Sequence, residues 1–415
     1  MLELNQKPRR MKFLAALQHR NYRLLWIGTL ISHTGDWLDQ IALNWLVLEQ
    51  TGSVFYLGMV NLCRGLPILF CTLIGGAMAD RMERRKLMML TQTANMVLAA
   101  LLAVMVLSGN APLVGILLVA TMRGVVIAFN LPARHSLISE LVPRNDLPNA
   151  VALNTMTMNL TKVIGPLLSG AIIALFGTAA CFLVNAVSFL AVLWTLAAMQ
   201  FPQETRVKDG PAKEETLAQS IGSGLKFVVG HRVILLLVLV AMVPTFFGQP
   251  YINLLAVFAQ QVFHSGPVGL GILTASAAFG SVIGALLMAN MPSLLTRGLS
   301  MLVFLLGFSL ALALFAINPS ERLASVLLIA AGAMYMSYNA THATLLQMTV
   351  PDNYRGRVLS TLFLNRGLVS LGTAFSATVA SLMSPRVAFL IMSAAILAFA
   401  LGLLLLTPAI RRLRV

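Results

Sequence analysis

The sequence predicts an all-α membrane protein with twelve transmembrane helices in two six-helix bundles related by pseudo-twofold symmetry. Three observations predict this fold: the chain is poor in charge, apolar stretches of membrane-spanning length recur along it, and basic residues gather in alternate loops. Of its 415 residues, 58% are hydrophobic and 10% are charged, and the mean hydropathy is +0.85. Soluble domains carry about 25% charged residues, so this chain could not cover a water-exposed surface.

The apolar stretches divide the chain into twelve spans. A helix needs about 20 predominantly apolar residues to cross a bilayer, and every stretch comes close to this length or exceeds it. We expect spans at residues 22–48, 54–79, 87–108, 113–137, 147–175, 178–199, 232–258, 268–290, 299–317, 323–347, 355–383 and 387–407.

The basic residues set the orientation. The first 23 residues hold six Lys or Arg, and the loop 80–86 holds four, whereas the loops 50–53, 108–112 and 259–267 hold none. Cytoplasmic loops carry an excess of Lys and Arg, so we expect both termini on the cytoplasmic side of a bacterial inner membrane. The same pattern accounts for the net charge of +15, and we therefore expect no nucleic-acid partner.

The chain divides into two similar halves. Residues 1–200 and 231–415 each supply six spans, and the polar segment 201–230 is predicted to be a cytoplasmic linker ending in an amphipathic helix. Short motifs recur about 210 residues apart: a Gly or Gln before His-Arg precedes spans one and seven, and Val-Pro follows spans four and ten. Repeated six-span halves are typical of secondary transporters, whose substrate site lies between the halves near the midplane.

The loop after the second span carries a distinctive motif. It contains Gly76, Asp80, Arg81, Arg84 and Arg85 in the spacing G-x-x-x-D-R-x-x-R-R. This resembles the signature loop of the major facilitator superfamily, although the family usually has glycine where this chain has glutamate at 83. The resemblance implies rocker-switch transport and a gating role for the loop. Membrane topology alone would explain the bases but would not require the acid.

Further motifs resemble the exporter branch of that superfamily, the drug:proton antiporter-3 type that holds enterobactin exporters and macrolide efflux proteins. They are Gly35-Asp36, the segment 132–136 around Arg134, the segment 140–143, and Gly165-Pro166. The resemblance implies efflux, often driven by protons, with Arg134, Gly165 and Pro166 among the gating positions. Lysophospholipid transporters share some of these residues.

Ionisable side chains lie deep inside five spans. They are Asp36 and Asp39 in the first, Arg64 in the second, Arg123 in the fourth, Lys162 in the fifth and Arg366 in the eleventh. A rise of about 1.5 Å per residue places each roughly 12–25 Å from the cytoplasmic end of its span. A charge at the bilayer centre costs at least about 2.5 kcal/mol, so each must face a wet cavity or a partner. Fixed ion pairs could explain single residues, but the cluster favours a cavity.

Polar side chains at helical spacing extend this prediction. The stripes comprise Ser32, Asp36, Gln40 and Asn44; Arg123, Asn130 and Arg134; Tyr335, Tyr338, Asn339 and His342; and Asn365 and Arg366. Lipid cannot satisfy such groups, so we expect them to line a shared substrate cavity. The alternative is that they bind one another in a dry bundle.

Pro244 and Pro250 should interrupt the seventh span, either to free carbonyls toward the cavity or as a packing kink.

The two central acids are the predicted proton-coupling residues. A carboxylate withdrawn from water binds a proton more tightly, and an approaching arginine makes it release that proton. Movement relative to Arg64 or Arg123 would therefore load or unload a proton. The family resemblance falls on Asp36 and favours it over Asp39.

The charge balance suggests the cargo. Four central bases against two acids leave an excess of two positive charges, and a cavity with that balance attracts anions. We expect proton-coupled export of a small amphipathic, anionic molecule such as a siderophore. The alternatives are a lysophospholipid transporter, a multidrug or macrolide efflux pump, and a non-transporting sensor or scaffold, which the central charges disfavour.

No pattern for catalysis is recognised in the sequence. Its three cysteines, Cys63, Cys71 and Cys181, lie inside spans as small apolar side chains. There is no nucleophile–base pair, metal-ligand spacing or phosphate-binding loop, so we expect no enzyme activity, cofactor or bound metal. The expected partners are a small-molecule substrate, protons and the lipid bilayer, with the chain acting as a monomer.

Overall fold

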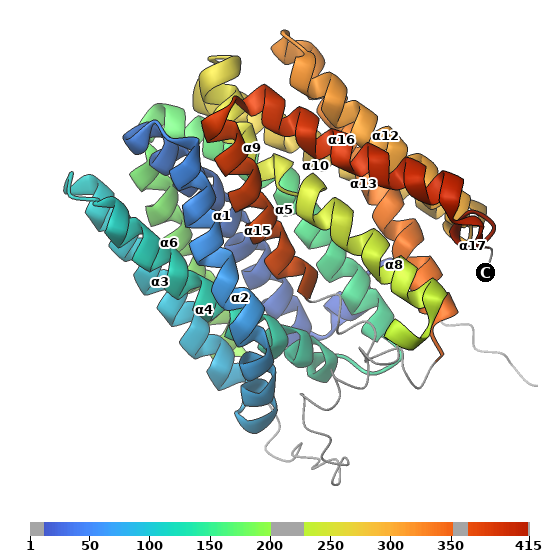
Figure 1. Cartoon of the computed structure of the whole chain (residues 1–415). Helices are drawn as coiled ribbons and strands as arrows, with labels where there is room; N and C mark the ends of the chain where they lie inside the picture. The colour runs from blue at the N-terminus through green and yellow to red at the C-terminus, as the bar shows by residue number, and fades with distance from the viewer. Residues whose placement is uncertain (1–11, 201–227, 352–363, 414–415) are drawn as a thin grey trace, which may run out of the picture.

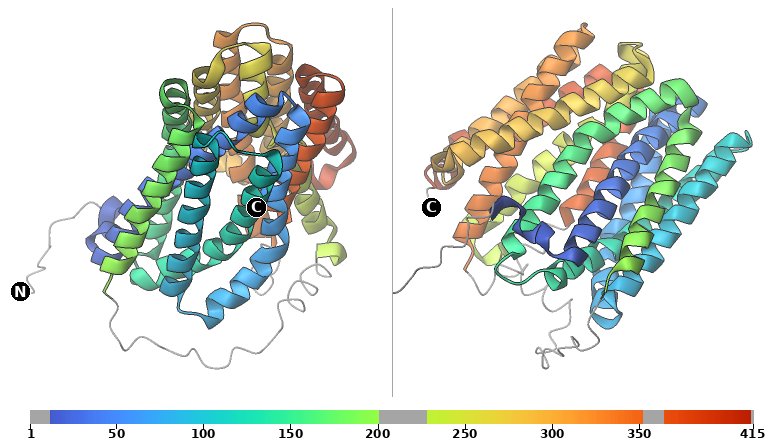
Figure 2. Two further views of the ribbon diagram at one scale, coloured as in Figure 1. Left: turned by 90° about the vertical axis from the view of Figure 1, so that its left-hand side faces the viewer. Right: turned by 180° about the vertical axis from the view of Figure 1, so that it is seen from behind.

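The fold is a bundle of long helices that run side by side (Figures 1 and 2). The computed structural model describes residues 12–200, 228–351 and 364–413, and these contain no β strand. The predicted linker with its amphipathic helix falls at residues 201–227, outside the described residues. We propose that this segment separates two structural halves.

The N-terminal half contains six long helices preceded by a short 3-10 helix. Their bounds are η1 (Lys12–Gln18), α1 (Arg20–Thr51), α2 (Val54–Arg81), α3 (Arg84–Leu107), α4 (Leu113–Leu141), α5 (Leu147–Phe176) and α6 (Thr178–Ala198). Each begins and ends within a few residues of the predicted span. In this half α1 packs on α5 and α6, α2 packs on α4, and α3 packs on α4 and α6.

The C-terminal half repeats this arrangement. Its elements are α8 (Arg232–Val243), η2 (Pro244–Gly248), α9 (Tyr251–Val257), η3 (Phe258–Val262), α10 (Gly266–Asn290), α11 (Pro292–Leu295), α12 (Gly298–Ile317), α13 (Glu321–Thr349), α15 (Leu364–Leu382), α16 (Pro385–Leu406) and α17 (Pro408–Arg411). Here α10 and α12 pack on α13, and α12 packs on α16.

The described helices are consistent with the twelve predicted spans. Among the described residues, ten helical segments are long and apolar enough to cross a membrane, with α8 to η3 counting as one. The other two predicted spans are α1, which carries two acids in its interior, and α15, which is described only from Leu364. Large apolar side chains such as Phe176, Trp194 and Leu406 are exposed on the outside of the bundle, where lipid would cover them.

The α-helix of the seventh span is interrupted where its prolines lie, because α8 ends at Val243 and Pro250 is the N-cap residue of α9. Residues 244–248 and 258–262 form π-helical turns, and Pro250 keeps helical backbone angles. Pro244 has no N–H to donate to the Val240 carbonyl, so that carbonyl loses its partner within the helix. The hydroxyl of Tyr338 on α13 donates to it at 2.6 Å. The freed carbonyl therefore anchors a neighbouring helix, which supports the packing alternative.

The two halves meet along two equivalent helix pairs. The second helix of each half packs on the fifth helix of the other, giving the α2–α15 and α5–α10 contacts (Figure 1). The backbones at α5–α10 are so close that a Cβ on Gly271 would lie 2.6 Å from the Pro166 carbonyl oxygen and 3.3 Å from the Gly170 Cα. Exchange of second and fifth helices is what pseudo-twofold symmetry requires, and it confirms the predicted fold class.

Candidate functional site

A small polar chamber lies inside the N-terminal half. Its volume is about 130 Å³, and its walls come from α1, α2, α3 and α4. The lining residues are Thr29, Ser32, His33, Asp36, Arg64, Gln92, Asn95, Arg123, Ile127, Asn130, Leu131 and Arg134. Ten of these twelve side chains are polar or charged, in a half whose sequence is otherwise strongly apolar. Pockets for drug-sized ligands measure about 300–1,000 Å³, so this chamber fits a small acidic group rather than a whole amphipathic molecule.

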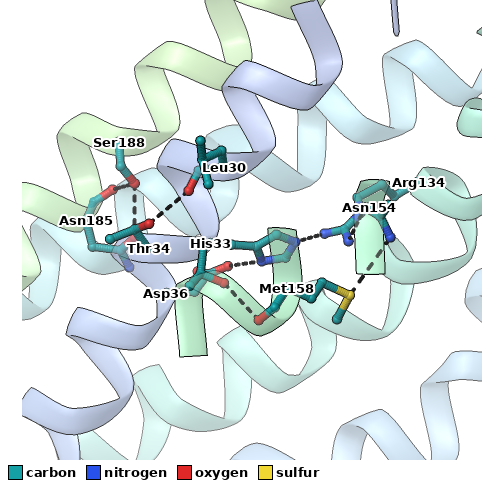
Figure 3. A network of polar contacts seen from close by, with 10 residues as sticks. Leu30, His33, Thr34, Asp36, Arg134, Asn154, Met158, Asn185 and Ser188 are labelled. Carbon is teal, nitrogen blue, oxygen red and sulfur yellow. Dashed lines mark hydrogen bonds and ion pairs between the residues drawn. The ribbon is translucent and has the colours of Figure 1, made fainter. Parts of the chain in front are cut away.

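Three residues form a chain of contacts along one wall (Figure 3). The Nη1 atom of Arg134 contacts Nε2 of His33, and Nδ1 of His33 lies 3.6 Å from Oδ2 of Asp36. The Asp36 side chain is 38% exposed and the His33 side chain 20% exposed, and both line the chamber. Arg123 and Arg64 also face Asp36. Asp36, the preferred proton-coupling candidate, therefore lies among three basic side chains and a histidine.

The second candidate acid, Asp39, forms a buried ion pair. Oδ1 of Asp39 contacts Nη1 of Arg123, and the two side chains are 0% and 2% exposed. The remaining oxygen, Oδ2, has no hydrogen-bond partner among the described residues. This geometry suits a fixed link between α1 and α4 better than exchange of protons with solvent.

Arg64 connects the chamber to a cluster of amides. Its Nη1 donates to Oε1 of Gln40, whose Nε2 donates to Oδ1 of Asn61 at 3.2 Å and to Oδ1 of Asn253 at 3.3 Å. Asn61 donates onward to Asn44, and Asn253 donates to Thr373 on α15. Gln40 and Asn44 thus belong to a hydrogen-bonded network that joins the two halves at α1 and α9.

The other predicted cavity residues of the N-terminal half also lie deep in the bundle. Asn130 lines the chamber and donates to the Thr91 hydroxyl at 2.8 Å. Lys162 on α5 is partly buried and faces His33.

The polar stripe on α13 makes its contacts within the C-terminal half. Tyr338 and His342 bond to the α8 carbonyls of Val240 and Leu237, at 2.6 and 2.8 Å. Gln249 donates to the Tyr335 hydroxyl, which also neighbours Asn339. None of these α13 residues lines the chamber. The side chains of Asn365 and Arg366 on α15 lie outside the described ones, so their place in a cavity stays a prediction.

The signature loop connects three helices at one end of the bundle. Arg84 pairs with Glu140 on α4, and Nη2 of Arg85 donates to the Ala197 carbonyl of α6 at 3.0 Å. The side chains of Asp80 and Arg81 lie outside the described ones, and a Cβ on Gly76 would meet no described atom within 4 Å. Glu83 has φ −60° and ψ 118°, which any residue can adopt, so the turn does not need the glycine of the family motif.

The Gly165-Pro166 motif lies where three helices converge. A Cβ on Gly165 would lie 2.4 Å from the Trp37 Cβ of α1, and the Pro166 carbonyl faces Gly271 of α10. The motif therefore permits close packing on both sides of α5. A gating role for it, as for Arg134, stays a prediction.

Several site residues were absent from the sequence prediction. His33, Gln92, Asn95 and Asn61 line the chamber or its amide extension. The sequence could have indicated His33 as a site residue, because a histidine three residues before a membrane-embedded acid lies on the same helix face as that acid. The amides on α2 and α3 had none, since single Asn and Gln residues in apolar spans also occur at helix–helix contacts.

Fold and chamber together define a class of protein: a helical membrane transporter built from two six-helix halves with ionisable side chains buried inside. The chain belongs to the transmembrane secretion effector family of the major facilitator superfamily, whose family model matches residues 11–413. This confirms the predicted superfamily.

Characterised relatives share most of the chain. It is 28% identical over 342 residues to a staphyloferrin A transporter of Staphylococcus aureus, covering 82% of this chain and 84% of the relative. It is 26% identical to the multidrug efflux pump Tap of Mycolicibacterium fortuitum, with 82% and 84% covered. It is 24% identical to the enterobactin exporter EntS of Citrobacter koseri, with 95% and 94% covered. These relatives support the predicted exporter branch.

Solved structures match the fold at low sequence identity. The nucleoside transporter NupG superposes with a TM-score of 0.73 at 15% identity, covering 92% of this chain and 98% of the other. A bacterial homologue of the lysosomal transporter Spinster, inward-facing and unoccupied, gives a TM-score of 0.70 at 16% identity, with 94% and 96% covered. Both show the shared fold.

Proposed function

We propose that this protein exports a small amphipathic anion across the bacterial inner membrane in exchange for protons. The observation that carries the proposal is the chamber itself, where Arg64, Arg123 and Arg134 line the same walls as the partly exposed carboxylate of Asp36. Three arginines against Asp36 and Asp39 leave one excess positive charge. A buried site with that balance attracts the acidic group of a ligand.

The names of the relatives favour a siderophore as the cargo. One transports staphyloferrin A and another exports enterobactin. A chamber of about 130 Å³ could take only one acidic group of such a molecule, so its bulk would lie between the halves. Multidrug efflux is the second candidate, since the pump Tap matches over a similar length. We further propose that the chain acts as a monomer with both termini in the cytoplasm.

The first prediction concerns coupling. Asp36→Asn should abolish accumulation driven by a pH gradient while cargo exchange without a gradient continues, because the amide can still hold a hydrogen bond but has no negative charge to hold a proton in the chamber. The measurement is uptake of labelled enterobactin and staphyloferrin A by inside-out vesicles, with and without an imposed gradient. If Asp36→Asn accumulates cargo as the wild type does, Asp36 is not the coupling residue.

The second prediction concerns charge selection. Arg64→Gln should weaken transport of an anionic siderophore by about 10- to 100-fold, because a hydrogen bond to a charged group contributes about 1.5–3 kcal/mol. Efflux of ethidium, a cationic dye, should change far less. Vesicle assays with both compounds measure this difference. Equal losses for the two compounds would count against electrostatic selection at Arg64.

A further inference from the structure

One nitrogen of the His33 ring is in contact with an arginine side chain. Nη1 of Arg134 contacts its Nε2, while its Nδ1 faces Oδ2 of Asp36 (Figure 3). A guanidinium group carries only donors, so Nε2 must accept through its lone pair. The ring proton then lies on Nδ1 and points toward the carboxylate. In this arrangement His33 is neutral. Arg134 at Nε2 and Asp36 at Nδ1 both favour the tautomer with its proton on Nδ1.

The neighbours of His33 make a second proton on the ring incompatible with this arrangement. Arg134 of α4, Lys162 of α5 and Asp36 of α1 are the charged groups that face the ring. Arg134 is only 6% exposed and also donates through Nη2 to Oδ1 of Asn154 on α5, at 3.3 Å. A proton on Nε2 would remove the acceptor lone pair and place two cations in contact in a poorly solvated site.

We propose that His33 is a proton-carrying residue of the transport cycle, and that the proton and Arg134 occupy its Nε2 in turn. A proton from solvent forms the Nε2–H bond, the hydrogen bond from Arg134 is lost, and the imidazolium donates Nδ1–H to Asp36. When Arg134 returns, the Nε2–H bond breaks and the proton goes back to solvent. No other bond changes.

This exchange links the protonation of His33 to the position of one arginine of the chamber. Arg134 in its docked position is one of three arginines that line the chamber. Protonation of His33 removes the acceptor that holds Arg134 in that position, and the added charge lies beside the Asp36 carboxylate. The proton and the docked Arg134 therefore exclude each other at Nε2. This step rests on the proposed proton-coupled export, with Asp36 as the partner that stabilises the charged ring.

The tautomer of His33 can be measured directly. Full-length protein with 15N-labelled histidine is reconstituted in liposomes, and nitrogen NMR spectra are recorded between pH 8 and pH 5. A His33→Gln spectrum identifies the resonances. The wild type should show a neutral ring protonated at Nδ1 at pH 7. Arg134→Gln should give a several-fold larger doubly protonated fraction at pH 6. A ring protonated at Nε2 in the wild type overturns the proposal, even if the arginine variant fails to fold.

A transport assay separates this proposal from the proposed function. His33→Gln should lose accumulation driven by pH far more than it loses siderophore exchange without a gradient, so the ratio of the two activities is the readout. His19→Gln is the matched control, because His19 also pairs with an aspartate, at 2.8 Å from Asp146, but lies outside the chamber. It should retain coupling. Full coupling in His33→Gln would refute the proton-carrying role. Failure of the wild type to move any siderophore would refute the cargo while leaving the NMR result as it stands.

Discussion

Asp39→Asn should lower the stability of the protein by about 3–5 kcal/mol, because it leaves the Arg123 guanidinium buried without its counter-charge. Both side chains are almost completely buried, and they link α1 to α4 in the middle of the N-terminal half. Arg123→Gln should be less damaging. A lone buried carboxyl group can take up a proton, whereas a guanidinium group cannot release one. The measurement is the midpoint of thermal unfolding in detergent micelles.

Two further variants control this experiment. The double variant with Asp39→Asn and Arg123→Gln removes both charges and should recover most of the lost stability. Glu140→Gln removes the partly exposed pair with Arg84, where solvent screens the charges, and should cost only about 0–1 kcal/mol. If Asp39→Asn and Glu140→Gln shift the midpoint equally, the central pair does not behave as a buried one.

The helices of this protein could be predicted from the sequence because lipid imposes a simple rule. Every span must be apolar and long enough, and every loop must satisfy its backbone in water. For that reason the predicted bounds of α5, 147–175, differ by one residue from those observed, Leu147–Phe176. The same rule indicated which charges would be buried, since Arg123 and Asp39 have no place in lipid.

The sequence could not predict which of the charged side chains pair with one another. Pairing depends on the height and rotation of each helix in the bundle as well as on the spacing of residues along the helix. Asp36 and Gln40 lie on one stripe of α1, four residues and about 6 Å apart along the helix axis. That distance is enough to place Asp36 in the chamber and Gln40 in the amide cluster. Similarly, the polar stripe of α13 did not indicate that the Tyr338 hydroxyl would donate to the carbonyl that Pro244 leaves free on α8. Its place in a substrate cavity stays a prediction.

The contact between the halves is a separate requirement for transport. Gly271→Leu should abolish transport while leaving the protein folded, because the new side chain has no space between α5 and α10. Its Cβ alone would lie 2.6 Å from the Pro166 carbonyl oxygen, which belongs to backbone and cannot rotate away. Packing within each half does not involve this contact, so the halves should separate at that end rather than unfold.

Two measurements test this separation. Siderophore export should be lost in Gly271→Leu and kept in Gly402→Leu, the matched control, because a Cβ on Gly402 of α16 would meet no atom of the described residues within 4 Å. Spin labels on cysteines at the exposed positions Asn110 and Ser320, one in each half, should lie several ångströms farther apart in Gly271→Leu than in the control. An unchanged distance with normal export would mean that the halves do not need this close approach. A lost fold would mean that α5 and α10 belong to one structural unit rather than to two that move against each other.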